Sequence, residues 1–467
     1  MPDSIVNESV TSMLVVATQD VSWLMSCIKL CFVQEAMAVD KSTSERIPSF
    51  EEQYAIFEVC SEPEVEDAYK RYMERSDILK DWRILYASER NDGPYPIRRE
   101  QLLDDGIVAT LFRGRSLWCL DAEFASAGDN RYEMKMGQCA FVDSNVASYI
   151  RSIAYKKPSE AREKIRERLA SSLTPDVLQN INPYLYLWEA HRNWNATTME
   201  CCEQTVAALY GLSLCDSPLD AGWGERYRTQ YVEEAEAHAK ILIKDFSKTL
   251  ESSLGQALKI HSAAVECMLL RAKILDSDKR MTPESKMLEL IRFMDEDLAI
   301  VMNRELIICA DIFFRGGRCN TSKKLNSLLT ADDPLDRIKN CAWDIYIFRI
   351  LDSLSFSKKF PDVTFFVDKI ITNDKDVADI VRLAELRAMM INRRTGLVLP
   401  FYNDNIVQWL NNLVGEKGFN LISERLQEDA FRRRANSRSY ESILRILAAD
   451  QQHLMSLVAS AKGVLTS

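Results

Sequence analysis

Apolar residues recur at helical spacing along most of the chain. The ranges with this spacing, each of which predicts a helix, are 51–72, 74–88, 159–169, 180–186, 287–314 and 377–391. Gly316 and Gly317 are expected to end the helix over 287–314, and Asp332-Asp333-Pro334 to begin another. From about residue 159 to 351 the pattern is almost entirely helical, so we expect a helix-rich protein.

Short apolar runs of a second kind predict strands. They cover 106–112, 115–120, 139–142, 363–367, 369–371 and 397–401. The islands near 139–143 and 364–372 are separated by about 200 mostly helical residues. Because parallel strands need a crossover connection, pairing these islands would give an α/β core with a large helical insertion.

This pattern divides the chain into three regions. We expect a helical N-terminal region over 1–105, an α/β core over 106–405 that is split by a helical insertion at about 200–330, and C-terminal helices over 406–467.

Composition agrees with a helix-rich globular protein. Apolar residues make up 47% of the chain and charged residues 27%, while 15 Gly and 13 Pro are few for 467 residues. The net charge of -10 argues against a surface coated with positive charge for non-specific nucleic-acid binding. It does not exclude a nuclease, because carboxylates that bind metal ions add negative charge. Basic residues cluster only locally, at 156–157, 323–324 and 432–434.

Cysteine usage and the N-terminal segment bear on the compartment. The 12 Cys form no Cys-x-x-Cys pair and there are only four His, so the spacing of a zinc site is absent. Asp20, Lys29 and Glu35 interrupt the apolar segment 10–39, which argues against a signal peptide and a membrane span. We therefore expect a soluble cytoplasmic protein that does not bind membranes.

Two acidic residues directly follow predicted strands. Asp143 follows the run 139–142, and Asp374 follows 369–371. The carboxyl ends of parallel strands face the crevice where α/β folds bind ligands, and Asn145 could orient Asp143. Asp143 is equally well explained as a helix N-cap, and Asp374 as a turn residue.

Two further acids lie in apolar surroundings. Glu189 follows the aromatic stretch 184–188, where an exposed helix position is the alternative. Asp344 lies in a run with no other charge, over 341–348. A buried carboxylate there needs either a metal ion or an ion pair, with Arg337 or Arg349 as the candidate partners.

Together these acids favour a divalent metal site. Three or four carboxylates from separate segments are the hard oxygen ligands that Mg²⁺ or Mn²⁺ requires. Such ions can activate water and neutralise charge on a phosphate group. Asp143, Glu189, Asp344 and Asp374 are thus the candidate metal ligands and catalytic residues, with Asp368 competing for the place of Asp374 and Asp376 assisting.

Two of these motifs resemble those of the PIN-like nucleases. Phe-Val-Asp-Ser-Asn at 141–145 is similar to the family's first strand and acid, and Ile-Ile-Thr-Asn-Asp at 370–374 to its closing motif. Glu189 and Asp344 fit the two middle acids, but the interval between them is far longer than a compact PIN domain has. The resemblance covers about 137–200 and 330–405.

The resemblance implies a small parallel sheet flanked by helices, and a Mg²⁺- or Mn²⁺-dependent endoribonuclease. RNA is then a more probable substrate than DNA. A toxin or phage-defence effector, controlled by an antitoxin or by a second copy of the chain, is the biological role expected by analogy. The alternative is a non-catalytic helical scaffold or regulatory binding protein with a degenerate PIN-like core.

Overall fold

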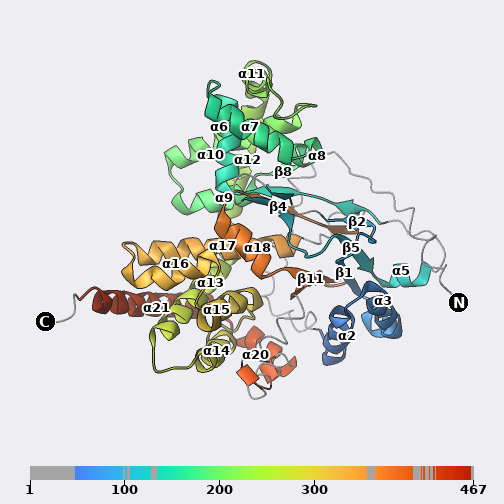
Figure 1. Ribbon diagram of the computed structural model, residues 1–467, viewed down its shortest axis with the longest axis vertical. Helices are drawn as coiled ribbons and strands as arrows, with labels where there is room; N and C mark the ends of the chain where they lie inside the picture. Colours follow the sequence, from blue (N-terminus) through green and yellow to red (C-terminus); the bar gives the residue numbers. More distant parts are fainter. Residues whose placement is uncertain are drawn as a thin grey trace.

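The computed structural model describes residues 48–97, 100–101, 106–127, 134–354, 363–402, 412, 414–415, 420, 424–425 and 428–463. The apolar segment 10–39 lies outside these residues. The described chain is mostly helical and contains mixed sheets of parallel and antiparallel strands (Figure 1). The helix-rich character expected from the sequence is therefore confirmed.

One sheet is antiparallel and has the strand order β12-β11-β1-β5-β2. Its strands are β1 (Trp82–Ser88), β2 (Tyr95–Pro96), β5 (Ser116–Leu120), β11 (Leu386–Asn392) and β12 (Val398–Tyr402). The strand predictions at 115–120 and 397–401 are confirmed. The boundary predicted at residue 105 falls within this sheet, because β1 pairs with both β5 and β11.

Two ranges predicted to be helices throughout end as strands of this sheet. The predicted helix 74–88 ends early and gives way to β1, and the predicted helix 377–391 gives way to β11. Every residue of both strands is buried. Both strands carry apolar residues at successive positions, 84–87 in β1 and 388–391 in β11, so they do not show the alternation that distinguishes a strand from a helix.

The second sheet positions the candidate site and has the order β3-β4-β10-β7-β8. Its strands are β3 (Glu100–Gln101), β4 (Ile107–Thr110), β7 (Ala140–Val142), β8 (Ile181–Asn182) and β10 (Lys369–Thr372). β10 is parallel to β7, with Ile371 opposite Val142, and β7 is parallel to β8. The predicted pairing of the two strand islands is therefore confirmed. A short parallel pair is formed by β6 (Met136–Gly137), which comes just before β7 in the chain, and β9 (Phe365–Phe366), which comes just before β10.

Helices surround the strands. Those that follow β7 and β8 are α6 (Ser144–Tyr155), α7 (Glu160–Ser172), α8 (Pro175–Gln179), α9 (Tyr184–Ala190), α10 (Ala196–Ser213), α11 (Trp223–Arg226) and α12 (Val232–Glu251). Later in the chain come α13 (Ser253–Ser277), α14 (Pro283–Arg292), α15 (Asn303–Arg315), α16 (Asn320–Asn326), α17 (Pro334–Leu354), α18 (Lys375–Leu383), α20 (Glu428–Ser437) and α21 (Tyr440–Ala461).

These helices form two groups with the strands between them. In Figure 1, α6–α12 gather at the top, while α13–α17 and α21 lie below. α2 (Phe50–Ser61) and α3 (Val65–Glu74) pack beside the antiparallel sheet, with α4 (Ser76–Leu79) and α5 (Ala122–Ala127) nearby. The expected helical insertion is present, since α10–α16 separate α9 from α17.

The single helix predicted over 287–314 is interrupted. α14 runs into a π-helical turn, η5 (Phe293–Asp297), and α15 begins only at Asn303. Ala299, between them, has a φ of 55°, a left-handed conformation that a continuing helix excludes. Apolar residues remain buried through the break, which is why the periodicity did not reveal it. Gly316, with a φ of 69°, ends α15 as predicted.

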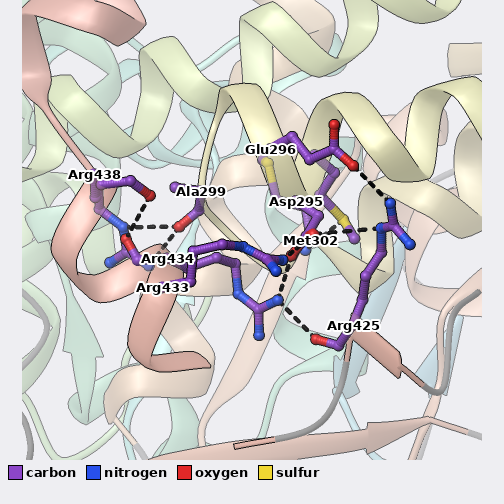
Figure 2. A network of polar contacts seen from close by, with 10 residues as sticks. Asp295, Glu296, Ala299, Met302, Arg425, Arg433, Arg434 and Arg438 are labelled. Atoms are coloured by element: carbon purple, nitrogen blue, oxygen red, sulfur yellow. Dashed lines mark hydrogen bonds and ion pairs between the residues drawn. The ribbon is translucent and has the colours of Figure 1, made fainter. Parts of the chain in front are cut away.

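The break holds the C-terminal helix α20 through a cluster of arginines (Figure 2). Arg425, Arg433 and Arg434 all form ion pairs with Asp295 of η5, and Arg425 also pairs with Glu296 at 2.7 Å. The Asp295 side chain is 1% exposed and that of Arg434 is 3% exposed. Buried charges are tolerated only when paired, so the ion pairs of Asp295 contribute to the packing of α20 against η5.

None of the described helices combines the length and the apolar content that a membrane span requires.

Candidate acidic site

The candidate site lies at the carboxyl ends of β7 and β10. Asp143 follows β7 and is the N-cap of α6, while Asp374 follows β10 and is the N-cap of α18. Because the two strands are parallel neighbours, their ends bring both acids to the same edge of the sheet. The capping interpretation of Asp143 is thus confirmed, and it is compatible with a place in the site.

Three donors fix the Asp143 carboxylate. One oxygen accepts hydrogen bonds from the Thr372 hydroxyl at 2.6 Å and the backbone N–H of Asn373 at 3.0 Å. The other accepts from the backbone N–H of Val146 at 2.8 Å. Asn145, which was expected to orient Asp143, is instead exposed. The donors therefore come both from the first turn of α6 and from the end of β10 with the residue that follows it.

Thr372 links the two acids. Its hydroxyl donates to Asp143 and accepts from the backbone N–H of Asp374 at 2.9 Å. Thr372→Val keeps the shape but leaves both partners short of a hydrogen bond, so we expect a loss of about 1–3 kcal/mol in the free energy of unfolding. Urea denaturation measures this loss. Thr372→Ser, which keeps the hydroxyl, is the control and should lose less; equal losses would mean that the hydroxyl does not link the acids.

Glu189, on α9, lies near Ser144, the residue that follows Asp143. Buried Asn182 at the end of β8 accepts a hydrogen bond from the backbone N–H of Tyr184, the first residue of this helix, at 2.9 Å. Glu189 is half-buried and not an exposed helix residue. Burial raises its pKa, hydrogen bonds from the side chain and backbone of Ser144 oppose that rise, and the charge of Asp374 adds to it.

Asp344 approaches from α17. Burial raises its pKa well above the usual range, and the charges of Asp374, Asp376 and Glu189 raise it further. The expected ion pairs with Arg337 and Arg349 do not form: Arg349 pairs with Glu305 at 2.6 Å, and Arg337 donates to Ser327 at 2.9 Å. The nearby positive charge is Lys324 of α16.

The four predicted acids therefore influence one another electrostatically. Burial raises the pKa of Asp143 to about 6, against the effect of its hydrogen bonds, and the charge of Glu189 contributes to the rise. Glu189 is in turn affected by Asp374, and Asp344 by both Asp374 and Glu189. Like charges this close oppose full ionisation, and a cation would relieve that repulsion.

Asp368 does not belong to this cluster. It precedes β10, whereas Asp374 follows it, so the two residues lie at opposite ends of the strand. Burial raises the pKa of Asp368 to about 8, and its Oδ2 atom has no hydrogen-bond partner among the described residues. Of the two candidates for the last acid, Asp374 is the one near the others. Asp376, 3% exposed, lies beside them with Lys324.

The acids are close without forming a ready-made metal site. Across the part of the chain that the structure describes, no three Asp, Glu, His or Cys side chains have an arrangement that could hold a metal ion. The donor chemistry fits a hard cation, since every acid offers carboxylate oxygens. Occupation by an ion would require the side chains to draw together.

Comparison with known proteins adds no further constraint. No protein-family model matches this chain, and no curated protein or solved structure matches it.

Proposed function

We propose that the chain is a metal-dependent phosphodiester hydrolase, and specifically an endoribonuclease. The observation that supports this proposal is the meeting of four acids from separate segments at the end of a parallel strand pair. The charge of Glu189 contributes to the raised pKa of Asp143, and the charge of Asp374 contributes to the raised pKa values of Glu189 and Asp344. The carboxyl ends of parallel strands, where Asp143 and Asp374 lie, are where α/β folds bind ligands.

The chain's own residues hold the carboxylates that would bind Mg²⁺ or Mn²⁺. Thr372, Val146 and Asn373 restrain Asp143, while Ser144 restrains Glu189. Asp344 and Asp374, on α17 and α18, would complete the set. Bound there, a divalent ion would polarise the phosphodiester and neutralise its charge. Without a bound cation the acidic edge repels the negatively charged RNA. RNA would therefore bind after the divalent cation or together with it.

RNA as the substrate, and a role in a toxin or phage-defence system with an antitoxin or second copy as regulator, stay predictions from the resemblance. A cytoplasmic location is part of the proposal. It is supported by the ten cysteines of the described residues, all of which are free thiols, since disulfides are rare in reducing compartments.

Cleavage of labelled single-stranded RNA tests the proposal. The wild type is expected to cut with Mn²⁺ or Mg²⁺ and to stop on chelation. Asp143→Asn keeps the helix cap but removes a charge from the site, so its rate should fall about a hundredfold or more. Circular dichroism checks that the variant folds.

The second candidate function is a non-catalytic scaffold with a degenerate core. The ion pair of Lys324 with Asp376 favours it, because a cation already neutralises part of the acid cluster. Equal cleavage by wild type and Asp143→Asn, or cleavage by neither, would contradict the nuclease proposal and favour the scaffold.

A further inference from the structure

A lysine from the helical insertion reaches into the acid cluster. Lys324 lies on α16, and its ammonium forms an ion pair with Asp376 of α18. The Asp376 side chain is 4% exposed, whereas that of Lys324 is 48% exposed. The charge of Lys324 also acts on Asp344 of α17, where it opposes the rise in pKa. Its ammonium is therefore in contact with Asp376 and contributes positive charge at Asp344.

The position of Lys324 is built into the fold. α16 packs against both α17 and α18, and the backbone N–H of Asn320 at its start donates to Asp379 of α18 at 3.2 Å. Thr321, Ser322 and Leu325 are fully buried on the same helix. A half-exposed ammonium on a fixed helix can stay with its carboxylate or move toward solvent without any change in the backbone.

We propose that Lys324 is the resident counter-ion of the acid cluster and competes with the divalent cation for Asp376 and Asp344. This inference rests on the proposed function and adds a regulator to the same site. While the ammonium neutralises these carboxylates, the site binds divalent ions more weakly than its acids alone would. A divalent ion must displace or repel the ammonium, so the lysine limits metal affinity.

Titration of the full chain with Mn²⁺ tests this inference without any cleavage assay. Binding is measured as the loss of the electron paramagnetic resonance signal of free Mn²⁺. Lys324→Met removes a positive charge from the cluster and should tighten Mn²⁺ binding about tenfold. Lys323→Met is the matched control, because Lys323 is the exposed neighbour on the same helix. It should change the affinity less than about twofold.

A second pair of variants covers the case in which Lys324→Met does not fold because Asp376 is left buried without a partner. Asp376→Asn removes the buried negative charge that would lack a partner. The double variant Asp376→Asn/Lys324→Met should bind Mn²⁺ about tenfold more tightly than Asp376→Asn alone. Unchanged affinity in either comparison would overturn the inference. If only the inference about Lys324 fails, the wild type still binds Mn²⁺ and cuts RNA. If the proposed function fails, the wild type does neither.

Discussion

Asp295→Asn is expected to lower the free energy of unfolding by about 3–5 kcal/mol, because it removes the buried negative charge that pairs with the buried guanidinium of Arg434. Asp295 receives ion pairs from Arg425, Arg433 and Arg434 (Figure 2). An Asn side chain is neutral and cannot accept from three guanidinium groups. Chemical denaturation measures the loss, and limited proteolysis within 428–438 shows whether α20 has separated from η5.

Glu296→Gln is the matched control in the same cluster. Its side chain is 59% exposed and pairs only with Arg425 among the described residues, so solvent screens the interaction. Removing its charge should cost at most about 1 kcal/mol. If the two variants lost equal stability, burial would not be the reason for the importance of Asp295, and the docking of α20 would have another cause.

Asp368→Asn is expected to stabilise the protein at neutral pH. Burial raises the pKa of Asp368 to about 8 in the folded chain, so the folded carboxyl keeps its proton at pH 7 while the unfolded one is ionised. Taking up that proton on folding costs roughly 3–5 kcal/mol at pH 7. Asn has nearly the same shape and carries no charge in either state, so it avoids this cost.

The sign of the pH dependence follows from the same shift. The pKa of Asp368 is higher in the folded chain than in the unfolded chain. Its contribution to the free energy of unfolding is therefore fully present below about pH 4. This contribution is lost as the pH rises from about 4 through about 8. The stabilities of wild type and Asp368→Asn should therefore agree near pH 4 and diverge up to pH 8. Parallel stability curves over this range would show that Asp368 titrates normally.

Much of the acidic site could be predicted from the sequence because its signals are local. An apolar run followed at once by Asp143 or Asp374 marks the end of a buried strand. The mostly helical stretch between these two strands is long enough for a crossover connection, and this correctly predicted that they pair in parallel. Asp344 was a candidate because of the cost of placing a carboxylate among apolar residues, and Glu189 because of its aromatic surroundings and its fit to a middle acid of the PIN-like nucleases.

The rest depends on tertiary contacts that local patterns do not contain. β1 and β11 are buried on both faces and therefore have no strand alternation to detect. Lys324 was visible only as part of a basic pair, since nothing near it in the chain points to Asp376. The Thr372 hydroxyl lay in the recognised motif, but its link to Asp143 needs two strands that are far apart in sequence.

The nuclease proposal is tested most directly by the rates at which Asp374→Asn and Asp368→Asn cut RNA in Mn²⁺. Both variants replace one carboxyl group beside the same strand, but only Asp374 lies with the other acids. Asp374→Asn should cut about a hundredfold more slowly than the wild type, like Asp143→Asn, whereas Asp368→Asn should cut at the wild-type rate. A wild-type rate in Asp374→Asn would contradict the proposed site.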